Sequence, residues 1–429
     1  MKRGELLRQL NTGALNSRLE PIYGDQLDST LRRLEDLIHG FAQVFPCSED
    51  SDTYLFSSPG RTELGGNHTD HQRGHALAAS VDLDTIACVV PNDSGIIRIK
   101  SLHHRMAEVD TRDLSIHPPE TGSSPALVRG IAARFRQLGH PVGGFDAYTT
   151  TKVLRGSGLS SSAAFEILVA TIIDHLFCGG HLSATQLAQI GQYAENVYFG
   201  KPCGLLDQLA CATGGAVAID FRDPAAPAIS QVSVDLEAMG YALCSIDSRA
   251  SHADLTSEYA AIPAEMGQVA AFFGKEYLSQ VSHEAFMAQL PQVRAACGDR
   301  AALRAHHFFL DDLRVPQQHD ALERGDIDAF LHHVRRSGLS SYMYLQNVST
   351  CRDSRRQPLA VLLAAAEELL QDRGACRVHG GGFAGTIQAY VPLELLDSFT
   401  SGMEAIGGQG CCHVLHIRNV GSTSLLPLQ

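Results

Sequence analysis

The sequence lacks the long apolar runs that membrane proteins need. No stretch approaches the roughly 18 consecutive apolar residues of a transmembrane helix. The N-terminal segment MKRGELLRQLNTGALNS begins with a basic pair, but Glu5, Arg8 and Asn11 interrupt any apolar signal-peptide core. We therefore expect a cytoplasmic protein with no membrane partner.

Basic residues are also scarce in this chain. Lysine and arginine together number 34 against 47 acidic residues, which gives a formal net charge of −13. Proteins that bind a phosphate backbone usually carry a basic surface patch. We expect no nucleic-acid partner, although a local basic pocket for a nucleotide remains compatible with this balance.

The eleven cysteines lack the spacing of a disulfide framework or a zinc site. Cys411 and Cys412 are adjacent, which suits neither a tetrahedral zinc site nor an ordinary disulfide. We interpret the cysteines as reduced and mostly buried thiols. The twenty histidines include three adjacent pairs, none of which has metal-site partners at the usual spacing.

A chain of 429 residues is too long for one ordinary core, and we expect two domains, 1–222 and 223–429, with residues 1–48 as a helical extension. The chain has no internal repeat. Strands and helices mix without a strict β-α-β alternation, which favours the α+β class. Apolar periodicity predicts helices near 27–38, 126–138, 165–176, 327–334 and 359–372, and strands near 77–90, 96–101, 145–153, 214–221, 241–246, 386–391 and 413–417. Ser183 is expected to cap a helix, and Gly374 to stop one.

The most informative segment is the loop LRGSGLSSSA, residues 154–163, which precedes the predicted helix at 165–176. A glycine-rich turn lets backbone N–H groups approach an anion, and the helix dipole adds positive charge at the same point. The serine hydroxyls can bond phosphate oxygens or ligate a metal. No Gly-Lys-Ser/Thr follows, so the loop is not a Walker P-loop.

Three further segments accompany this loop: SPGRTELGGNHTDHQRG (58–74), GKPCGLLDQLACATGG (200–215) and RVHGGGFAG (377–385). In content, order and approximate spacing, the four segments resemble the signatures of the galactokinase family within the GHMP kinase superfamily. The resemblance runs from about Phe56 to the C-terminus. It implies a two-domain α+β fold with the active site in the interdomain cleft, and an ATP-dependent sugar 1-kinase that uses Mg²⁺.

The resemblance assigns the catalytic roles to Asp207 and Arg61. Asp207, in CGLLDQ, matches the aspartate that orients or deprotonates the sugar hydroxyl. An ordinary aspartate has a pKa near 3.9 and is a weak base at neutral pH, so its value would lie in holding the hydroxyl in line. Arg61 matches the arginine beside that aspartate, where a guanidinium would keep Asp207 ionised and offset phosphoryl charge.

ATP and the metal are assigned in the same way. Glu195, twelve residues before Asp207, matches the metal-binding glutamate of the family, and with the Ser162 hydroxyl it would hold one Mg²⁺ against the phosphates. Ser161 is the competing ligand. The expected ATP-binding residues are Gly156, Ser157, Gly158, Leu159, Ser160, Ser161 and Ser162.

The sugar pocket resembles the family through His68, Asp70, Gly204 and Tyr259, and Asn67 stands where the family has a sugar-contacting glutamate. The sequence departs from the family pattern at several positions of these segments. His71 and Gln72 replace the usual tyrosine and asparagine, His379 replaces a threonine, and Ala384 replaces a glycine. The departures near Asp70 put the identity of the sugar in question more than the chemistry.

The resemblance implies a sugar kinase that acts on galactose and ATP, and we expect a monomer. Galacturonate or another galactose-like sugar is an alternative substrate, because a neutral Asn67 would not repel a carboxylate at C6 as a glutamate would. A non-catalytic sugar-sensing regulator is a second alternative. Such a protein is expected to lose part of the catalytic set, whereas Arg61, Ser162, Glu195 and Asp207 are all present.

Overall fold

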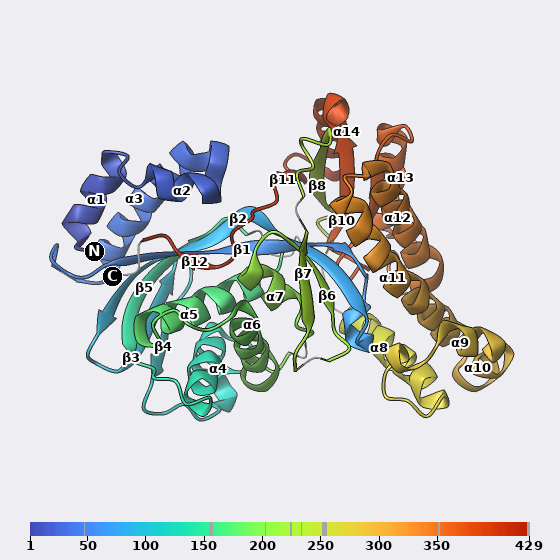
Figure 1. Ribbon diagram of the computed structural model, residues 1–429, viewed down its shortest axis with the longest axis horizontal. Helices are drawn as coiled ribbons and strands as arrows, with labels where there is room; N and C mark the ends of the chain where they lie inside the picture. The colour runs from blue at the N-terminus through green and yellow to red at the C-terminus, as the bar shows by residue number, and fades with distance from the viewer. Residues whose placement is uncertain are drawn as a thin grey trace.

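A computed structural model describes residues 1–46, 48–153, 158–201, 203–223, 225–232, 234–250, 255–350 and 352–426. It contains two β-sheets, each packed against helices, in the mixed arrangement that the sequence predicts (Figure 1). No helix among these residues is long and apolar enough to cross a membrane.

The larger sheet has eight strands in the order β12-β1-β2-β5-β3-β4, with β6 paired to β2 and β7 paired to β6. Its strands are β1 (Tyr54–Gly65), β2 (His75–Asn92), β3 (Ile96–Ser101), β4 (Ala107–Asp110), β5 (Gly144–Thr151), β6 (Ala216–Asp220), β7 (Ala228–Val232) and β12 (Thr423–Ser424). All neighbours are antiparallel except β3 and β5. The long strand β2 pairs with β1 along most of its length and so fixes the register of the first signature segment.

Helices cover both faces of this sheet (Figure 1). One face carries α1 (Arg3–Asn11), α2 (Asn16–Tyr23) and α3 (Leu27–Val44), and the other carries α4 (Ser124–Gln137), α5 (Ser161–Phe177), α6 (Ala184–Tyr193) and α7 (Leu206–Thr213). The strands serve both faces because their side chains alternate: Leu55 packs with the N-terminal helices, whereas Phe56 packs with α4 to α6. The N-terminal extension is therefore a layer of the first half of the chain.

The smaller sheet has the order β11-β8-β10-β9 and is antiparallel throughout. Its strands are β8 (Tyr241–Asp247), β9 (Ala375–His379), β10 (Thr386–Pro392) and β11 (Cys412–Leu415), and α13 (Pro358–Leu370) and α14 (Leu396–Gly407) pack on it. Leu243 and Tyr390 of this sheet share one buried cluster with Leu64 and Leu77 of the larger sheet. The two halves of the chain therefore meet through a common core, beside the signature segments.

The remaining helices of the second half are α8 (Thr256–Phe272), α9 (His283–Ala288), α10 (Leu290–Cys297), α11 (Asp299–Glu323) and α12 (Ile327–Ser340). Helices α8 to α10 form an extended arm, whereas α12 packs on the smaller sheet through Phe330 and Tyr390 (Figure 1). Of these, the sequence predicts only α12, from its apolar stripe, and α8 to α11 are new findings. Helix α8 places Tyr259 beside the glycine segment that follows β9.

Two expectations need comment. Gly374 does not stop the helix predicted near 359–372: α13 ends at Leu370, and the left-handed residues are Gln371 and Asp372. Gly374 instead permits close strand approach, because a Cβ there would lie 2.4 Å from the Tyr390 carbonyl oxygen. The division at 222/223 stays a prediction, although β7 and β12, from beyond residue 222, join the larger sheet.

Candidate active site

The candidate site is built around an ion pair between Arg61 and Asp207. Arg61 lies in β1 next to a register irregularity, and Asp207 lies in the first turn of α7. The Arg61 Nε atom is 2.7 Å from Asp207 Oδ1, and Nη2 is 2.5 Å from the same oxygen. Ser160 donates its hydroxyl to the other carboxylate oxygen. Residues far apart in the sequence thus converge on the carboxylate that the family resemblance assigns to catalysis.

The surroundings of Asp207 keep its carboxylate charged. Burial alone would raise the pKa of Asp207, but the Arg61 charge and the hydrogen bonds from Ser160 and Arg61 outweigh it and lower the pKa. Burial likewise opposes the charge of Arg61, and Asp207 restores it, so the pKa of Arg61 is raised. The side chain of Asp207 remains 35% exposed while that of Arg61 is only 9% exposed. Arg61 therefore binds the carboxylate from the protein interior, and the carboxylate of Asp207 remains partly exposed to solvent.

The described part of the glycine loop lies against this pair. Arg61 donates from its guanidinium to the Gly158 carbonyl and from its backbone N–H to the Leu159 carbonyl, at 3.1 Å for the latter. The loop leads into α5, as predicted, with Ser160 in the left-handed conformation (φ 54°) just before it. Leu159 is buried in the core, so its backbone alone is available to a ligand. Gly156 and Ser157 lie outside the described residues.

The proposed metal ligand Glu195 belongs to a second charged cluster. It lies in the π-helical turn Ala194–Phe199 and is 3% exposed. The Gln208 amide donates to Glu195 and also to Glu166, at 3.0 Å in both cases. Burial and the charge of Glu195 raise the pKa of Glu166 well above its ordinary value, and one Glu166 oxygen is buried with no hydrogen-bond partner.

Glu166 was not predicted as a site residue. It follows Ser162 by one helical turn on α5, so the two side chains share a face of that helix. An acidic residue inside the otherwise apolar run AAFEILVA was the available signal. Ser162, Glu166 and Glu195 offer oxygen donors only, which is the donor set that Mg²⁺ prefers.

His68 connects the first signature segment to the fourth. Its Nε2 atom lies 3.2 Å from the Gly381 carbonyl, which can only accept, so Nε2 carries the proton. The Nδ1 atom is buried with no hydrogen-bond partner. Burial, followed by the charge of His71, lowers the pKa of His68 to about 3. The ring is therefore neutral, and the Nδ1 lone pair is left to accept a hydrogen bond from a hydroxyl group.

Asp70, Gly204 and Tyr259 lie close to the same segments. A Cβ on Gly204 would lie 2.2 Å from Asp70 Oδ2, so only a glycine leaves that carboxylate in place. Tyr259 donates its hydroxyl to the Gly382 carbonyl at 2.8 Å. The glycine segment after β9 is thus contacted by His68 at Gly381 and by Tyr259 at Gly382, and the structure brings these expected sugar residues together from both halves of the chain.

The side chain of Asn67, which the sequence predicts to contact the sugar, is engaged within the protein. It is 1% exposed and donates to Glu63 and to the Gly380 carbonyl, at 3.2 and 2.7 Å. Its amide oxygen accepts from Asn347 and Ser341, at 2.9 and 3.3 Å. Both donors and both lone pairs of the amide are used inside the protein, so Asn67 has no hydrogen-bonding capacity left for a sugar. The sequence could not show this, because Asn347 and Ser341 are remote in the chain.

We therefore expect Asn67→Glu to destabilise the protein instead of changing its preference at C6. The new carboxylate would lie beside Glu63 in a buried region, and an uncompensated buried charge costs about 3 kcal/mol. Thermal unfolding and the ratio of kcat/KM for galactose and galacturonate are to be measured together. Asn67→Gln is the control, since it has the same length without the charge. A stable Asn67→Glu variant with a changed ratio would contradict this interpretation.

His379, which replaces the family threonine, is also internal. Its Nε2 atom accepts from the Glu63 backbone N–H at 3.2 Å and lies 3.0 Å from the Thr62 hydroxyl, and Nδ1 contacts Thr386 at 2.9 Å. A Cβ on Gly158 would lie 2.7 Å from His379 Nδ1. His379 therefore supports β1 and the glycine loop through buried contacts. Burial lowers the pKa of His379 well below the ordinary value.

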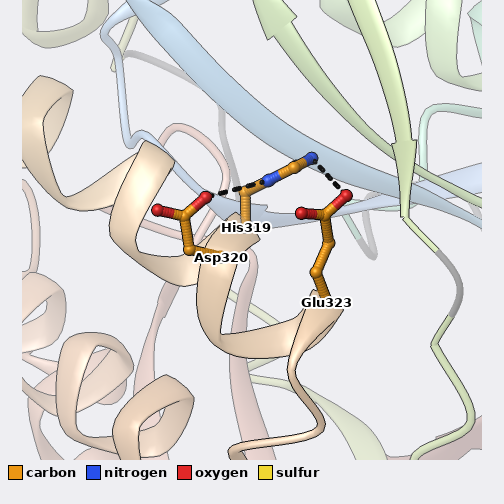
Figure 2. Close-up of side chains that lie close together, drawn as sticks. All are labelled: His319, Asp320 and Glu323. Atoms are coloured by element: carbon orange, nitrogen blue, oxygen red, sulfur yellow. Dashed lines mark hydrogen bonds and ion pairs between the residues drawn. The ribbon is translucent and has the colours of Figure 1, made fainter.

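A separate cluster on α11 has the residue types of a metal site. Figure 2 shows His319 between Asp320 and Glu323, with ring nitrogens 3.4 and 3.8 Å from the two carboxylates. Both acids are exposed, and all three residues come from one stretch of helix. Within the described parts of the chain, these contacts are ordinary surface ion pairs, and we assign them no function.

Two family models match the part of the chain that carries these segments. The family model "GHMP kinases N terminal domain" matches residues 126–215, which include the glycine loop, Glu195 and Asp207. The model "Galactokinase galactose-binding signature" matches residues 39–91, which include Arg61, His68 and Asp70.

The chain is similar to a galactokinase of Streptomyces coelicolor, with 31% identity over 356 residues that cover 82% of this chain and 87% of that protein. Among solved structures, it resembles Lactococcus lactis galactokinase complexed with galactose, with a TM-score of 0.77, 24% identity, and coverage of 91% of this chain and 99% of that one. Methanococcus jannaschii mevalonate kinase matches with a TM-score of 0.58, 13% identity, and coverage of 86% and 99%. The two structural matches agree with the two-domain α+β fold that the sequence predicts.

Proposed function

Because the chain belongs to the galactokinase family of the GHMP kinases, we propose that it transfers the γ-phosphoryl group of ATP to the anomeric hydroxyl of galactose. The products are ADP and galactose 1-phosphate. The observation that carries this proposal is the Arg61–Asp207 pair beside the glycine loop, with Ser160 on the second carboxylate oxygen. This pair supports the proposal because it sets a charged acceptor for a hydroxyl next to Gly158 and Leu159, the described part of the loop that we propose to bind phosphate.

In this mechanism, Asp207 accepts the hydrogen bond of the sugar hydroxyl and holds its oxygen in line with the γ-phosphorus. The bond from that oxygen to phosphorus forms as the bond from phosphorus to the bridging oxygen of ADP breaks, and the hydroxyl proton passes toward Asp207. The pKa of Asp207 is low, so the carboxylate is a weak base. Its main contribution is to position the sugar hydroxyl, and the proton leaves the hydroxyl only as the new bond forms. Arg61 holds the carboxylate in place and supports the loop carbonyls at Gly158 and Leu159.

The N-terminus of α5 and the backbone of the glycine loop are proposed to bind the ATP phosphates. Ser162 and Glu195 are the proposed ligands of Mg²⁺, which supplies charge neutralisation on the phosphates when bound. The oxygen-only donors of this region and the unpartnered buried oxygen of Glu166 fit such a cation. The Ser160 hydroxyl is engaged by Asp207, so its proposed contribution to ATP binding lies in its backbone.

The sugar is proposed to contact His68, Asp70, Gly204 and Tyr259. The His68 lone pair accepts from one hydroxyl, and Asp70 accepts from others. Asn67 stabilises this region through its hydrogen bonds with Gly380 and Asn347. A monomeric state and a cytoplasmic location stay predictions.

The proposal is tested by measuring ADP formation with galactose, galacturonate, N-acetylgalactosamine and arabinose. We expect the highest kcat/KM with galactose. Galacturonate belongs in this panel because the sequence departs from the family pattern next to Asp70, at His71 and Gln72. A preference for galacturonate would change the substrate and keep the chemistry, whereas no turnover with any sugar would favour the non-catalytic regulator.

The metal assignment yields its own prediction. Glu195→Ala and Ser162→Ala should raise the Mg²⁺ concentration needed for half-maximal activity, and excess Mg²⁺ should partly restore turnover, because each variant removes one oxygen ligand. Ser161→Ala is the matched control on the adjacent hydroxyl. An unchanged Mg²⁺ dependence in both variants would place the metal elsewhere, and a loss confined to Ser161→Ala would move the serine ligand by one position.

A further inference from the structure

The proposed metal ligand Glu195 is already paired with a cation of the protein. The Lys201 ammonium lies 3.0 Å from Glu195 Oε1, and the Gln208 amide holds Oε2 at the same distance. Each oxygen of the carboxylate therefore already has one partner. A metal ion that binds Oε1 would lie next to the Lys201 ammonium, and the two positive charges would repel each other.

The local fold directs Lys201 onto Glu195. The π-helical turn Ala194–Phe199 ends at Gly200, which adopts φ 82° and turns the chain back. The backbone N–H groups of Gly200 and Lys201 both donate to the Glu195 carbonyl, at 3.0 and 3.1 Å. The ammonium and the backbone N–H of Lys201 thus both contact Glu195. The ion pair is therefore fixed by the conformation of this turn.

The two partners of Glu195 differ in how easily they can leave. Gln208 is fully buried and also binds Glu166, so its amide is fixed on two sides. Lys201 has a flexible stem, and its side chain is 62% exposed while that of Glu195 is 3% exposed. The ammonium therefore approaches from the open side and can move into water without leaving a buried group unpaired.

The charges favour a cation at this position whether or not a metal is bound. Glu166 and Glu195 bring two carboxyl groups to one buried amide, and the charge of Asp207 also acts on Lys201. A counter-ion that fills this place lowers the repulsion among the acids when no metal is present. The same counter-ion opposes Mg²⁺, because two cations that contact Glu195 Oε1 repel each other.

We propose that Lys201 is a resident counter-ion of Glu195 that Mg²⁺ displaces, so that Lys201 weakens and thereby sets the affinity of the metal site. This inference rests on the proposed role of Glu195 as a metal ligand. It predicts that removal of the lysine charge improves metal binding, an effect that a merely structural lysine would not produce.

The test is Lys201→Met, with Mg²⁺ titrated at a fixed concentration of ADP. Calorimetry gives the dissociation constant of ADP at zero and at saturating Mg²⁺, and the midpoint of the transition gives the metal affinity without turnover. We expect the midpoint to fall by about twofold to fivefold, the size of a partly exposed ion pair. The ratio of the ADP dissociation constants at zero and at saturating Mg²⁺ measures the contribution of the metal separately from any direct effect of Lys201 on ADP binding.

Two variants serve as controls. Lys201→Arg keeps the charge and should keep the midpoint close to that of the wild type. Lys2→Met removes the same charge from another 3.0 Å ion pair, with Asp52 in the N-terminal layer, and should leave the midpoint unchanged. A lower midpoint in Lys2→Met would assign the effect to net charge and overturn the proposal.

Glu195→Ala separates this inference from the proposed function. If Glu195→Ala abolishes the Mg²⁺ effect on ADP and Lys201→Met behaves as the wild type, Glu195 is a ligand and the role of Lys201 is refuted. If both variants respond to Mg²⁺ as the wild type does, the metal assignment itself fails. A higher midpoint in Lys201→Met would show that the lysine assists the metal complex and would also overturn the proposal.

Discussion

Replacing Asp207 with asparagine is expected to lower turnover by at least about 100-fold while sugar binding survives. The amide has nearly the same shape and can still occupy the place beside Arg61 and Ser160. It cannot take up the hydroxyl proton, and its NH₂ group would face either the Arg61 guanidinium or the sugar. The loss should therefore appear in kcat, measured by ADP formation at saturating galactose and ATP.

Galactose binding to Asp207→Asn, measured by calorimetry, is the control for folding and for the pocket. Dissociation constants within a few-fold of the wild type would show that the loss is chemical. Near-normal turnover in Asp207→Asn would remove the carboxylate from the mechanism, and loss of both sugar binding and the unfolding transition would point to a structural role.

Replacing Arg377 with methionine is expected to cost about 3–5 kcal/mol of unfolding free energy. Arg377 lies in β9, is 1% exposed, and pairs with the buried Glu63 of β1. It also donates to Ser337 and to the Leu64 carbonyl, at 3.3 and 3.4 Å. Without the guanidinium, Glu63 keeps its buried position and loses its counter-charge, and the two halves of the chain lose a direct link.

The pH dependence of this variant follows from Glu63. Burial raises the pKa of Glu63 even with Arg377 nearby, and the pKa should rise further once the arginine is gone. A carboxyl group with a raised folded-state pKa stabilises the fold at low pH and loses that contribution as pH rises through the folded pKa. The deficit of Arg377→Met relative to the wild type should therefore be smaller at pH 5 than at pH 8, as measured by chemical unfolding.

The double variant Arg377→Met with Glu63→Gln provides the control. Glutamine removes the charge and keeps an acceptor for the Asn67 amide, so much of the lost stability should return. A double variant that is no more stable than Arg377→Met would mean that packing and the backbone contacts of Arg377, and not the unpaired charge, account for the loss.

Features set by local periodicity could be predicted from the sequence. The stripe at Leu27, Leu31 and Leu34 gives α3, and the strand expected at 96–101 is β3 with the same bounds. Ser183 forms a capping box with Gln186, as a serine three residues before a glutamine allows. Each of these depends on residues within a few positions of one another, where spacing alone determines which side chains share a face.

Features that depend on distant contacts could not be predicted. The amide oxygen of Asn67 is engaged within the protein, because Asn347 and Ser341, far away in the sequence, donate to it. The helical arm from α8 to α10 has no stripe as regular as that of α3, and its helices are fixed by packing against α11. The sequence predicts Gly374 as a helix stop. In the structure a glycine is required there because the Tyr390 backbone of the neighbouring strand lies too close for a Cβ.

The candidate site shows the same division. The family resemblance named Arg61 and Asp207, and the structure places them in contact. The amide of Gln208 and the buried carboxyl of Glu166 were missed, because their significance comes from Glu195, which lies on another helix. Lys201 lies within the signature segment 200–215, but its ion pair depends on the turn that reverses the chain at Gly200.

The most direct test of the central claim is the identity of the phosphorylated product. Purified protein is incubated with ATP, Mg²⁺ and galactose, and phosphorus NMR identifies the oxygen that carries the new phosphoryl group. We predict phosphate on the anomeric oxygen, formed in equal amount to ADP and absent with Asp207→Asn. Phosphorylation at another hydroxyl, or ATP hydrolysis without a sugar phosphate, would contradict the account.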